Sequence, residues 1–381
     1  MTTRGIAELL GSQGQRPRRR RRARPREVPA RALAYVALCA IGFAMAVPLA
    51  WMLATSLKDP TQVLVSHDKW LPMRQVMGKY GPMDGARIEY GPVYEARLDG
   101  VEIRGLEIGR APGARRLRVL DPTDMRGRIV TVPADATRPV ERLHLEWQNY
   151  ARAWQAIKVE FAFGGLLRDA DAFLVFYINS IIVAVAVTLG QVATSSLAAY
   201  AFARLRFPGR DGLFLGYLAT LMVPAVITMI PVYILLSRLR LTDTYWALIL
   251  PAMFSAYGTF MLRQFFLTVP RDLEDAARID GASLFGIYWN IILPLSKPAL
   301  ATLTIFVFLH TWNDFMWPLI VIDSLNLKTL PIGLAHFQGP YLTEWHLLMA
   351  ASVIVMVPVL IVFVAGQRYF VRGIILSGMK A

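Results

Sequence analysis

Long hydrophobic stretches dominate the chain and set its organisation. A helix that crosses the hydrocarbon core of a bilayer needs about 20 mainly apolar residues. Six stretches are long enough: 32–57, 173–202, 213–236, 246–267, 298–322 and 347–370. We therefore predict an all-α integral membrane protein with six transmembrane helices. The first of them is separated from the other five by the long segment 58–172.

The 58–172 segment follows a different pattern. Apolar and polar residues alternate, as in strands with one buried face, in five stretches: 87–90, 93–98, 101–108, 116–120 and 128–132. Asp99 and Gly100 separate two of them and are typical of a two-residue hairpin turn. We predict a small β-rich insert outside the membrane. It has few residues for a core of its own, so we expect it to pack on the membrane domain or on a partner.

An amphipathic helix is predicted after these strands, near 145–157, with Trp147, Tyr150 and Trp154 on one face. The insert as a whole is compatible either with a docking surface or with an insertion that has no direct role in transport. The predicted domains are a basic tail (1–31), a first helix (32–57), the insert (58–172), a five-helix membrane core (173–372) and a C-terminal tail (373–381).

Composition supports membrane insertion. The chain has a mean hydropathy of +0.42 and only 18% charged residues, which is rare in soluble domains. Its formal charge is +14, and residues 1–31 hold ten arginines against two acidic residues. A nucleic-acid-binding tail is one explanation. We favour another and expect no nucleic-acid partner, because a basic block directly before an apolar segment keeps the N-terminus of a first helix in the cytoplasm.

The distribution of basic residues also predicts the orientation. The regions predicted to be cytoplasmic (1–31, 203–212, 263–297 and the C-terminal end) hold twenty basic residues, against three in the short loops of the other side. The insert is exempt from this comparison, since long segments translocate regardless of charge. We predict that both termini are cytoplasmic. A cleaved signal peptide fits less well, because the first apolar stretch is long and lacks a clear small-residue cleavage site.

Motifs for catalysis are absent from the sequence. It contains no G-x-x-x-x-G-K-[ST] phosphate loop and no H-E-x-x-H metal motif. The single cysteine, Cys39, lies in the first predicted helix, which excludes an intramolecular disulfide and a cysteine metal site. We therefore expect no catalytic residue, no bound metal and no cofactor in this chain, and we expect any work driven by ATP to come from a partner.

A polar segment, 270–298, separates the fourth and fifth hydrophobic stretches and must face water, because so polar a loop cannot lie in lipid. It begins with a short predicted helix that has three acidic residues at the positive end of its dipole. Ala276 and Ala277 allow another surface to approach closely. Gly281 suits the left-handed conformation that ends a helix, and Ser283 is a candidate N-cap. The pattern predicts either a rigid helix that transmits force or a solvated connector.

One stretch of this segment reads Asp275-Ala276-Ala277-Arg278-Ile279-Asp280-Gly281-Ala282 and is followed by Leu293-Pro294-Leu295. It resembles the cytoplasmic coupling loop of ABC importer permeases. That family usually has glutamate where this chain has Asp275, and Glu274 stands just before it, so both acids remain candidates for the coupling contact. Further segments resemble the carbohydrate-uptake branch, specifically the smaller, maltose-permease-G-like subunit of maltose-type transporters: 179–180, 198–204, 206–210, 311–315 and 367–373.

The resemblance implies a MetI-like permease fold and a function in the bacterial inner membrane. The chain would be the permease subunit of an ATP-driven importer. Its partners would be a second permease, an ATPase dimer that binds Mg-ATP, and an extracytoplasmic sugar-binding protein. The C-terminal tail would reach into the ATPase dimer. The cargo would be an oligosaccharide such as an α-glucoside, with a polyol or a glycerol-phosphate ester as the alternative. The ATPase would dock on Glu274, Asp275, Ala276, Ala277, Asp280, Gly281 and Ala282.

Four residues of the fifth hydrophobic stretch are candidates for the translocation path: Trp312, Asn313, Asp314 and Trp317. Polar side chains are costly in lipid and therefore face the bundle interior or a water-filled cavity. Aromatic faces together with amide and carboxylate groups suit a sugar or a polyol. The alternative is that Asp314 lies near the outer interface and is satisfied by a neighbouring helix.

Two other classes of protein fit parts of the sequence. An ion-coupled secondary transporter would need intramembrane carboxylates or inverted repeats, for which Asp314 alone is weak support. A membrane-anchored structural or sensory module, with the insert as its functional head, is the second alternative.

Overall fold

The computed structural model describes residues 27–65, 69–81, 89–98, 100–162, 167–339 and 343–378. The chain divides into two compact units, 1–51 and 52–381, and the boundary falls inside helix α1 (Glu27–Ser56). In the first unit, the side chains of α1 from residue 33 onwards are almost all exposed although most are apolar. An apolar helix that is not buried in protein is typical of a membrane span.

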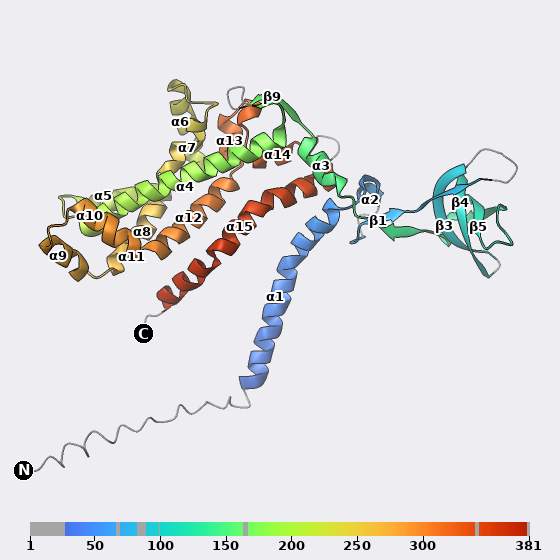
Figure 1. Ribbon diagram of the computed structural model, residues 1–381, viewed down its shortest axis with the longest axis horizontal. Helices are drawn as coiled ribbons and strands as arrows, with labels where there is room; N and C mark the ends of the chain where they lie inside the picture. The colour runs from blue at the N-terminus through green and yellow to red at the C-terminus, as the bar shows by residue number, and fades with distance from the viewer. Residues whose placement is uncertain are drawn as a thin grey trace, which may run out of the picture. The chain divides into compact units, whose positions relative to one another are not determined.

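The second unit contains a bundle of helices centred on α4 (Ala172–Arg204). Helices α8 (Ala256–Thr268) and α12 (Lys297–Trp312) pack along α4, and α15 (Trp345–Gly378) packs on α12 (Figure 1). Two clusters of buried apolar side chains hold the bundle together. One joins α4 to α8 and α12, and the other joins α4 to α12 and α15.

The number of membrane spans depends on two bent pairs of helices. Four described segments are long and apolar enough to span by themselves: Leu33–Ser56, Ala172–Arg204, Tyr245–Thr268 and Trp345–Gln367. Two pairs qualify only together: Arg210–Met222 with Ala225–Arg238, bent by 101°, and Leu284–Leu295 with Lys297–Trp312, bent by 79°. The described residues therefore contain four spans, or up to six if each bent pair crosses once.

The predicted helix 213–236 is not continuous. Helix α5 (Arg210–Ala219) and the turn that follows it end before Val223, and α6 (Ala225–Arg238) begins after Pro224. Proline has no N–H to donate and disfavours a helical conformation of the residue before it. Val223 is accordingly extended, with φ −83° and ψ 119°.

The predicted span 298–322 is interrupted as well. Helix α12 ends at Trp312, and α13 (Met316–Val321) begins four residues later. Between them, Asn313 donates to a carbonyl of the preceding turn at 2.7 Å, and Asp314 accepts from a backbone N–H of the following turn at 3.3 Å. Side chains that bind nearby backbone groups compete with helix continuation, which accounts for the break.

Short helices connect the long ones. They are α2 (Pro60–Val65), α3 (Gln148–Gln155), α7 (Tyr245–Ile249), α9 (Asp272–Ile279), α10 (Leu284–Ile287), α11 (Leu293–Leu295) and α14 (Leu330–Ala335). The 3-10 turns are η1 (Ala134–Ala136), η3 (Thr220–Met222), η4 (Pro251–Met253) and η6 (Leu325–Leu327), and one π-helical turn is η5 (Tyr288–Ile292). The C-terminal tail predicted from residue 373 is helical as far as Gly378, because α15 continues to that residue.

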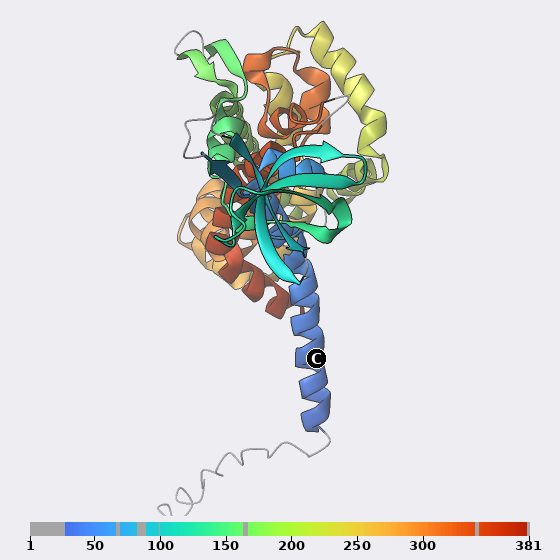
Figure 2. The same ribbon diagram turned by 90° about the vertical axis from the view of Figure 1, so that its right-hand side faces the viewer.

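The insert forms an antiparallel sheet of order β2-β3-β4-β5-β6, with β7 paired to β3. The strands curl around one another, as Figure 2 shows. They are β2 (Met77–Tyr80), β3 (Glu89–Leu98), β4 (Val101–Ala111), β5 (Ala114–Asp121), β6 (Ile129–Pro133) and β7 (Thr137–Pro139). Separate two-stranded ribbons are β1 (Met73–Gln75) with β8 (Glu141–Leu143), and β9 (Lys158–Ala162) with β10 (Leu167–Asp171).

The hairpin predicted at residues 99–100 is confirmed. Leu98 pairs with Val101, and Gly100 has a φ of +84°. Asp99, like residues 87–88 of the first predicted strand, lies outside the described residues. The sheet of the insert encloses a cluster of its own that includes Ile103 and Leu117, both fully buried, although the sequence offered few residues for such a core. Elsewhere in the insert, Ala153 and Val159 belong to the second core cluster, so this part packs on the membrane bundle as expected.

The amphipathic helix predicted at 145–157 is α3, and its aromatic face is only partly buried. Tyr150 and Trp154 pack on the second core cluster, whereas Trp147 is 63% exposed and stacks on Tyr150. Asn149, which is fully buried, donates to the carbonyls of Ser56 and Lys58 at 2.9 Å each. The amide of Asn149 therefore fixes α3 to the segment that follows α1.

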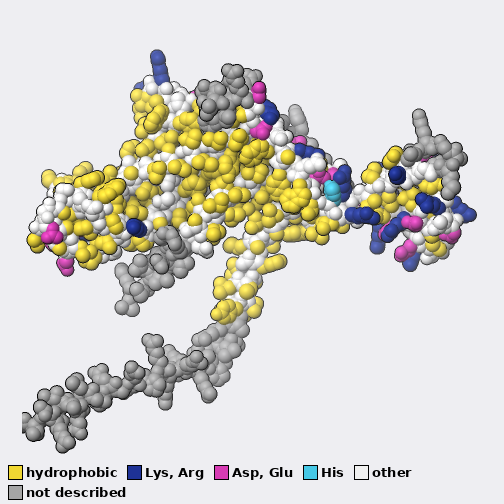
Figure 3. All heavy atoms as spheres, viewed as in Figure 1, with side chains coloured by type: hydrophobic (Ala, Val, Ile, Leu, Met, Phe, Trp, Pro, Cys, Tyr) yellow, Lys and Arg dark blue, Asp and Glu magenta, His cyan; other side chains and the backbone are white. Residues whose placement is uncertain are grey.

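Polarity is distributed unevenly over the surface. Apolar side chains cover the visible face of the helices, while charged side chains gather over the sheet of the insert and near α9 (Figure 3). This distribution matches a bundle that lies in lipid and two polar regions that lie outside it.

Candidate functional site

Helix α9 lies in the polar segment 270–298 and has the local signals that the sequence predicted. Acidic residues occupy its first turn and Arg278 its last turn, an arrangement that matches the helix dipole. Gly281 follows with a φ of +80°. The hydroxyl of Ser283 then caps α10 by accepting from the backbone N–H of Gly286 at 3.1 Å. The left-handed glycine and the serine cap are both confirmed.

The seven residues predicted to dock a partner do not all lie on the surface of α9. Ala277 is partly buried and packs on the first core cluster. Glu274 is buried, with only 4% exposed. The exposed ones are Asp275, Ala276, Asp280, Gly281 and Ala282. An exposed apolar residue accompanies them, because Ile279 is 87% exposed.

Glu274 is buried because it forms an ion pair with Arg204, the last residue of α4. Glu274 Oε1 lies 3.0 Å from Arg204 Nε, and the two side chains are 5% and 2% exposed. The two atoms make no aligned hydrogen bond, so charge rather than a directed N–H···O contact holds them together. Arg204 Nη2 also donates to the carbonyls of Phe266 and Val269, the latter at 2.6 Å. Arg204 thus joins the ends of α4 and α8 to α9.

Other side chains strengthen this junction between α4 and the polar segment. Tyr200 of α4 donates from its hydroxyl to the carbonyl of Leu284 at 3.0 Å. The hydroxyls of Ser196 and Tyr288 lie 2.7 Å apart in a buried hydrogen bond. The last three turns of α4 therefore hold both ends of the loop that carries α9.

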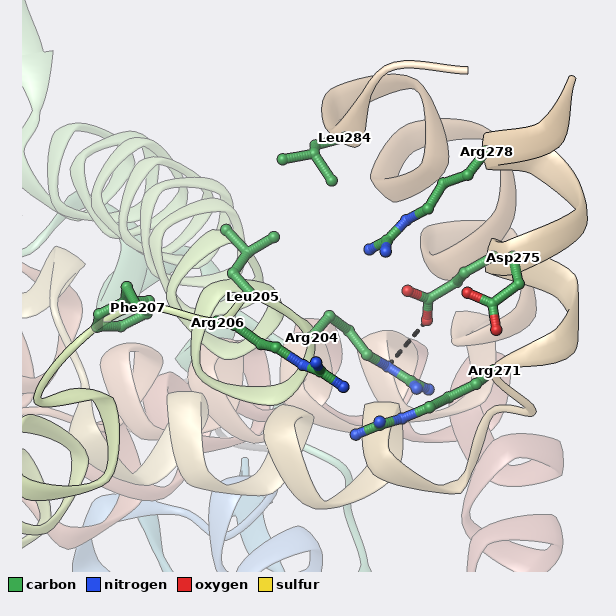
Figure 4. A pocket seen from close by; sticks show the side chains of 9 residues that line it. Arg204, Leu205, Arg206, Phe207, Arg271, Asp275, Arg278 and Leu284 are labelled. Atoms are coloured by element: carbon green, nitrogen blue, oxygen red, sulfur yellow. Dashed lines mark ion pairs between the residues drawn. The ribbon is translucent and has the colours of Figure 1, made fainter. Parts of the chain in front are cut away.

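A cleft of about 670 Å³ opens beside this junction, between the α4–α5 loop and α9. Arg206 reaches into it from the loop, and Arg271 and Arg278 reach into it from the α9 side, while Asp275 lies on the α9 wall (Figure 4). The dashed line in Figure 4 marks the ion pair of Arg204.

The residues predicted for the translocation path are not gathered on one surface. The indole of Trp312, which is 1% exposed, donates to the carbonyl of Val355 at 3.2 Å. The indole of Trp317 donates to the carbonyl of Ala247 at 2.9 Å. Both rings are engaged in contacts between helices of the same chain. Of the four residues, only Asn313 is exposed.

Asp314 lines a small cavity of about 50 Å³ within the chain. His310, Ser180 and Thr329 line the same cavity. The hydroxyl of Thr329 is buried and has no hydrogen-bond partner among the described residues. Apolar side chains such as Val183 and Leu248 complete the lining. The cavity is too small for a sugar, since ligand pockets usually measure about 300–1,000 Å³.

Two polar residues organise the opposite end of the bundle, and sequence reasoning did not select them as site residues. Asn179 of α4 donates to the carbonyls of Asn326 and Lys328 at 3.0 and 2.8 Å and accepts from the hydroxyl of Tyr245 at 2.5 Å. Ser180 accepts from the N–H of Leu330 at 2.8 Å. These bonds fix the loop 323–330 to the start of α4.

Asp243 ties a second loop to the same region. Its carboxylate accepts from the backbone N–H groups of Asp323 and Ser324 at 3.1 and 2.9 Å, and from the Ser324 hydroxyl. Burial by itself raises the pKa of Asp243, but the hydrogen bonds from Ser324 and Asp323 outweigh it and hold the pKa below its usual value. Asp243 therefore stays charged at neutral pH and keeps the two loops together.

No group of three or more His, Cys, Asp or Glu side chains that could hold a metal ion occurs among the described residues. The arrangement is instead that of a polytopic membrane protein with an exposed, anchored helix in one polar loop.

The sequence profile of the family "Binding-protein-dependent transport system inner membrane component" matches residues 174–376, more than half of the chain. The chain belongs to this family. It is therefore a membrane permease component of an ABC importer and is not itself catalytic, as the resemblance of the 270–298 segment implied. The family assignment also places the chain in the inner membrane.

This chain matches two curated relatives over most of their length. The arabinooligosaccharides transport system permease protein AraQ of Halalkalibacterium halodurans is 40% identical over 215 residues, which is 56% of this chain and 77% of the relative. The sn-glycerol-3-phosphate transport system permease protein UgpE of Yersinia pestis is 36% identical over 231 residues, which is 60% of this chain and 79% of the relative.

A solved structure has a similar fold. It comes from a bacterial ABC transporter involved in the import of the acidic polysaccharide alginate, and the match has a TM-score of 0.61 at 18% identity. The match covers 91% of this chain and 98% of that one. The shared arrangement identifies the fold as that of the MetI-like permeases.

Proposed function

We propose that this chain imports an oligosaccharide as one of two permease subunits, with solute delivered by an extracytoplasmic binding protein and ATP hydrolysed by a partner ATPase dimer. The observation that carries the proposal is α9, an exposed helix held to the core through the buried Arg204–Glu274 pair. The relatives support a carbohydrate-type cargo, since AraQ is named for arabinooligosaccharides. UgpE, named for sn-glycerol-3-phosphate, supports a glycerol-phosphate ester as the second candidate.

In this proposal each end of the bundle faces a defined side of the membrane. The end that carries α9 and both termini face the cytoplasm, and the insert and the loops fixed by Asn179 and Asp243 face outward. The excess of basic residues in the α9-side loops supports this orientation. Each bent helix pair crosses the membrane once, which gives six spans.

Asp275, rather than Glu274, makes the contact with the ATPase. The two acids are neighbours in sequence, but Glu274 is buried against Arg204 while Asp275 is exposed. A carboxylate already engaged in a buried ion pair is not available to another protein. Ala276, Asp280, Gly281 and Ala282 extend the docking surface around Asp275, and Ala277 supports it from within.

Transport then follows from a two-state change in the partner. Binding of Mg-ATP by the ATPase dimer closes that dimer and moves α9, and the buried pair passes the movement to α4. The permease pair switches between inward-facing and outward-facing states, and hydrolysis resets it. Mg-ATP is bound by the ATPase and not by this chain.

The translocation path runs between this chain and the second permease. Asn313 is our candidate for a direct contact with solute, because it is the exposed member of the predicted set. Trp312, Asp314 and Trp317 support the break at Asn313 from inside the chain. Exposed apolar side chains of η3 and α6, such as Met222 at 84% and Val226 at 73%, face lipid or the second permease.

The test is co-purification of the complete transporter with the wild-type chain and with Gly281→Asp. A side chain at Gly281 is strained because of its φ of +80°, and aspartate adds a charge to the docking surface. We expect loss of ATPase assembly and of substrate-stimulated ATP hydrolysis. Gly216→Ala is a matched control, since a Cβ there meets nothing within 4 Å and the residue lies in α5. Assembly and stimulation that are unaffected by Gly281→Asp would contradict the coupling role.

The cargo is tested separately by uptake of labelled solutes into cells that depend on this transporter. We expect uptake of an arabinose or glucose oligosaccharide that excess unlabelled oligosaccharide inhibits. Uptake of sn-glycerol-3-phosphate without any oligosaccharide uptake would favour the second candidate. Uptake that persists without ATP and depends on a proton or sodium gradient would contradict the proposal as a whole.

A further inference from the structure

The cleft beside α9 contains more positive charge than its own carboxylates neutralise. Arg204 and Glu274 neutralise each other at its buried end. Arg206, Arg271 and Arg278 also line the cleft, and none of their side chains has an ion-pair or hydrogen-bond partner in the described part of the chain. Asp275 is the remaining carboxylate of the lining. Three guanidinium groups therefore face one carboxylate.

The stability of α9 explains only part of this set of arginines. Arg278 suits the last turn of the helix, but Arg271 stands at the N-terminus of α9, where a positive charge opposes the helix dipole. Arg271, Asp275 and Arg278 follow the spacing i, i+4, i+7 and so lie on one face of the helix. That face is the wall of the cleft, across which Arg206 approaches from the α4–α5 loop (Figure 4).

We infer that the cleft binds an acidic surface of the ATPase subunit, whose carboxylates reach Arg206, Arg271 and Arg278. The inference rests on the proposed function, in which α9 docks on the ATPase. Guanidinium groups bind carboxylates through paired, charge-assisted hydrogen bonds. The cleft has a volume of about 670 Å³ and is open, so it admits side chains of a partner. The partner must also present a cation to Asp275, so its surface carries one basic group flanked by acidic ones.

A protein surface fits this pattern better than a lipid headgroup does. The phosphate of an anionic lipid would be repelled by Asp275, which lies between Arg271 and Arg278 on the same helix face. Ile279, which is 87% exposed, follows Arg278 in the sequence and needs an apolar contact. A partner that covers α9 satisfies all these groups at once.

The experiment measures the affinity of the ATPase subunit that co-purifies with this chain for the permease pair in phosphatidylcholine nanodiscs. Arg206→Glu and Arg278→Glu are compared singly and together, at low and at high salt. We expect each reversal to weaken binding about tenfold or more, because a hydrogen bond to a charged group contributes about 1.5–3 kcal/mol. The salt dependence of the remaining affinity should also decrease, since fewer charges attract the partner.

Lys297→Glu is the matched control, because Lys297 is an exposed cation at the start of α12 that does not line the cleft. We expect the affinity of the ATPase for the permease pair with Lys297→Glu to stay within about twofold of wild type. Acidic-to-lysine changes in the ATPase that restore binding to Arg278→Glu would support the inference further.

Three results would overturn the inference. If the arginine reversals leave affinity unchanged while Gly281→Asp abolishes binding, the coupling role stands and the cleft has no acidic partner. If neither change affects binding, the proposed function fails together with the inference. If the reversals alter only the binding of phosphatidylglycerol added to the nanodiscs, the cleft holds a lipid phosphate.

Discussion

The adjacent acids Glu274 and Asp275 have opposite environments, and helix geometry is the reason. Successive residues of an α-helix project about 100° apart, so one of two neighbours can face the bundle while the other faces solvent. Glu274 meets Arg204 in the interior, and Asp275 lies in the open cleft. The sequence left both acids as candidates, because it does not contain the angle at which α9 meets α4.

The buried pair leads to a prediction at this scale. Arg204→Gln or Glu274→Gln should each uncouple the transporter, because removal of one member of a buried ion pair leaves a charge without its partner and costs about 3–5 kcal/mol. We expect substrate-stimulated ATP hydrolysis and uptake to fall together, with a lower melting temperature of the detergent-solubilised protein. The double change Arg204→Met with Glu274→Met should recover part of the stability, since it leaves no unpaired charge.

Asp211→Asn is the control for this prediction. It breaks an ion pair with Arg210 whose carboxylate side chain is 75% exposed, and exposed pairs contribute about 0–1 kcal/mol. If Arg204→Gln and Asp211→Asn have equal melting temperatures, the buried pair contributes no more to stability than the exposed pair does.

Among the elements, α4 connects the two ends of the bundle. It is a continuous helix of 33 residues, with Asn179 near its start and Arg204 at its end. These two residues are separated by about 37 Å along the axis at 1.5 Å per residue. One holds the loop 323–330, and the other holds α9. A helix fixed at both ends can carry a displacement from one membrane surface to the other.

The role of Asn179 in holding the loop 323–330 can be tested. Asn179→Ala removes two hydrogen bonds to loop carbonyls and one from Tyr245, and buried groups left unsatisfied cost about 1–3 kcal/mol each. We expect faster tryptic cleavage at Lys328, because the loop that contains it is released, and a lower melting temperature. Thr228→Val is the control, since the Thr228 hydroxyl is exposed and bonds only within its own helix. Equal cleavage rates in Asn179→Ala and wild type would contradict the role of Asn179.

The sequence predicted most long helices and strands but not their interruptions. The apolar stretches 173–202 and 347–370 correspond to α4 and α15, because length and hydropathy suffice for a straight helix. The breaks at Pro224 and Asn313 were missed for different reasons. Proline inside a membrane helix can be accommodated as a kink, so Pro224 alone does not indicate a bend of 101°. Asn313 stops α12 through hydrogen bonds that a hydropathy pattern does not reveal.

At the scale of the whole molecule, the sheet of the insert and the helix bundle have separate cores. The two clusters of the bundle contain no residue of the sheet, and the sheet encloses its own cluster. The ribbon of β1 and β8 brings Gln75 opposite Glu141, so the chain enters and leaves the sheet at neighbouring points.

This arrangement predicts that the sheet of the insert can be removed. Replacement of residues 77–139 by a short Asn-Gly turn should close the β1–β8 ribbon as a hairpin. We expect the shortened chain to reach the membrane, to assemble with the ATPase and to keep its basal ATP hydrolysis. Uptake then separates the two interpretations of the insert: uptake at the wild-type level excludes a functional head, and lost uptake with normal assembly assigns the insert a docking role. Failure of the shortened chain to assemble would contradict the independence of the two cores.

The sequence by itself determined the class of the protein. Three features suffice to predict a multi-span ABC importer permease, because each is a local property of the chain. They are the hydropathy, the excess of arginine and lysine in the loops predicted to be cytoplasmic, and the motif of residues 275–282. Local propensity also determined the left-handed Gly281 and the cap at Ser283. The tertiary structure alone decided which side chains are available. Arg204 closes a hydrophobic helix and looks like a solvated end, yet it is buried; Trp312 looks like a sugar platform, yet α15 covers it. Burial and pairing depend on how distant segments pack, and that packing is a property of the whole fold.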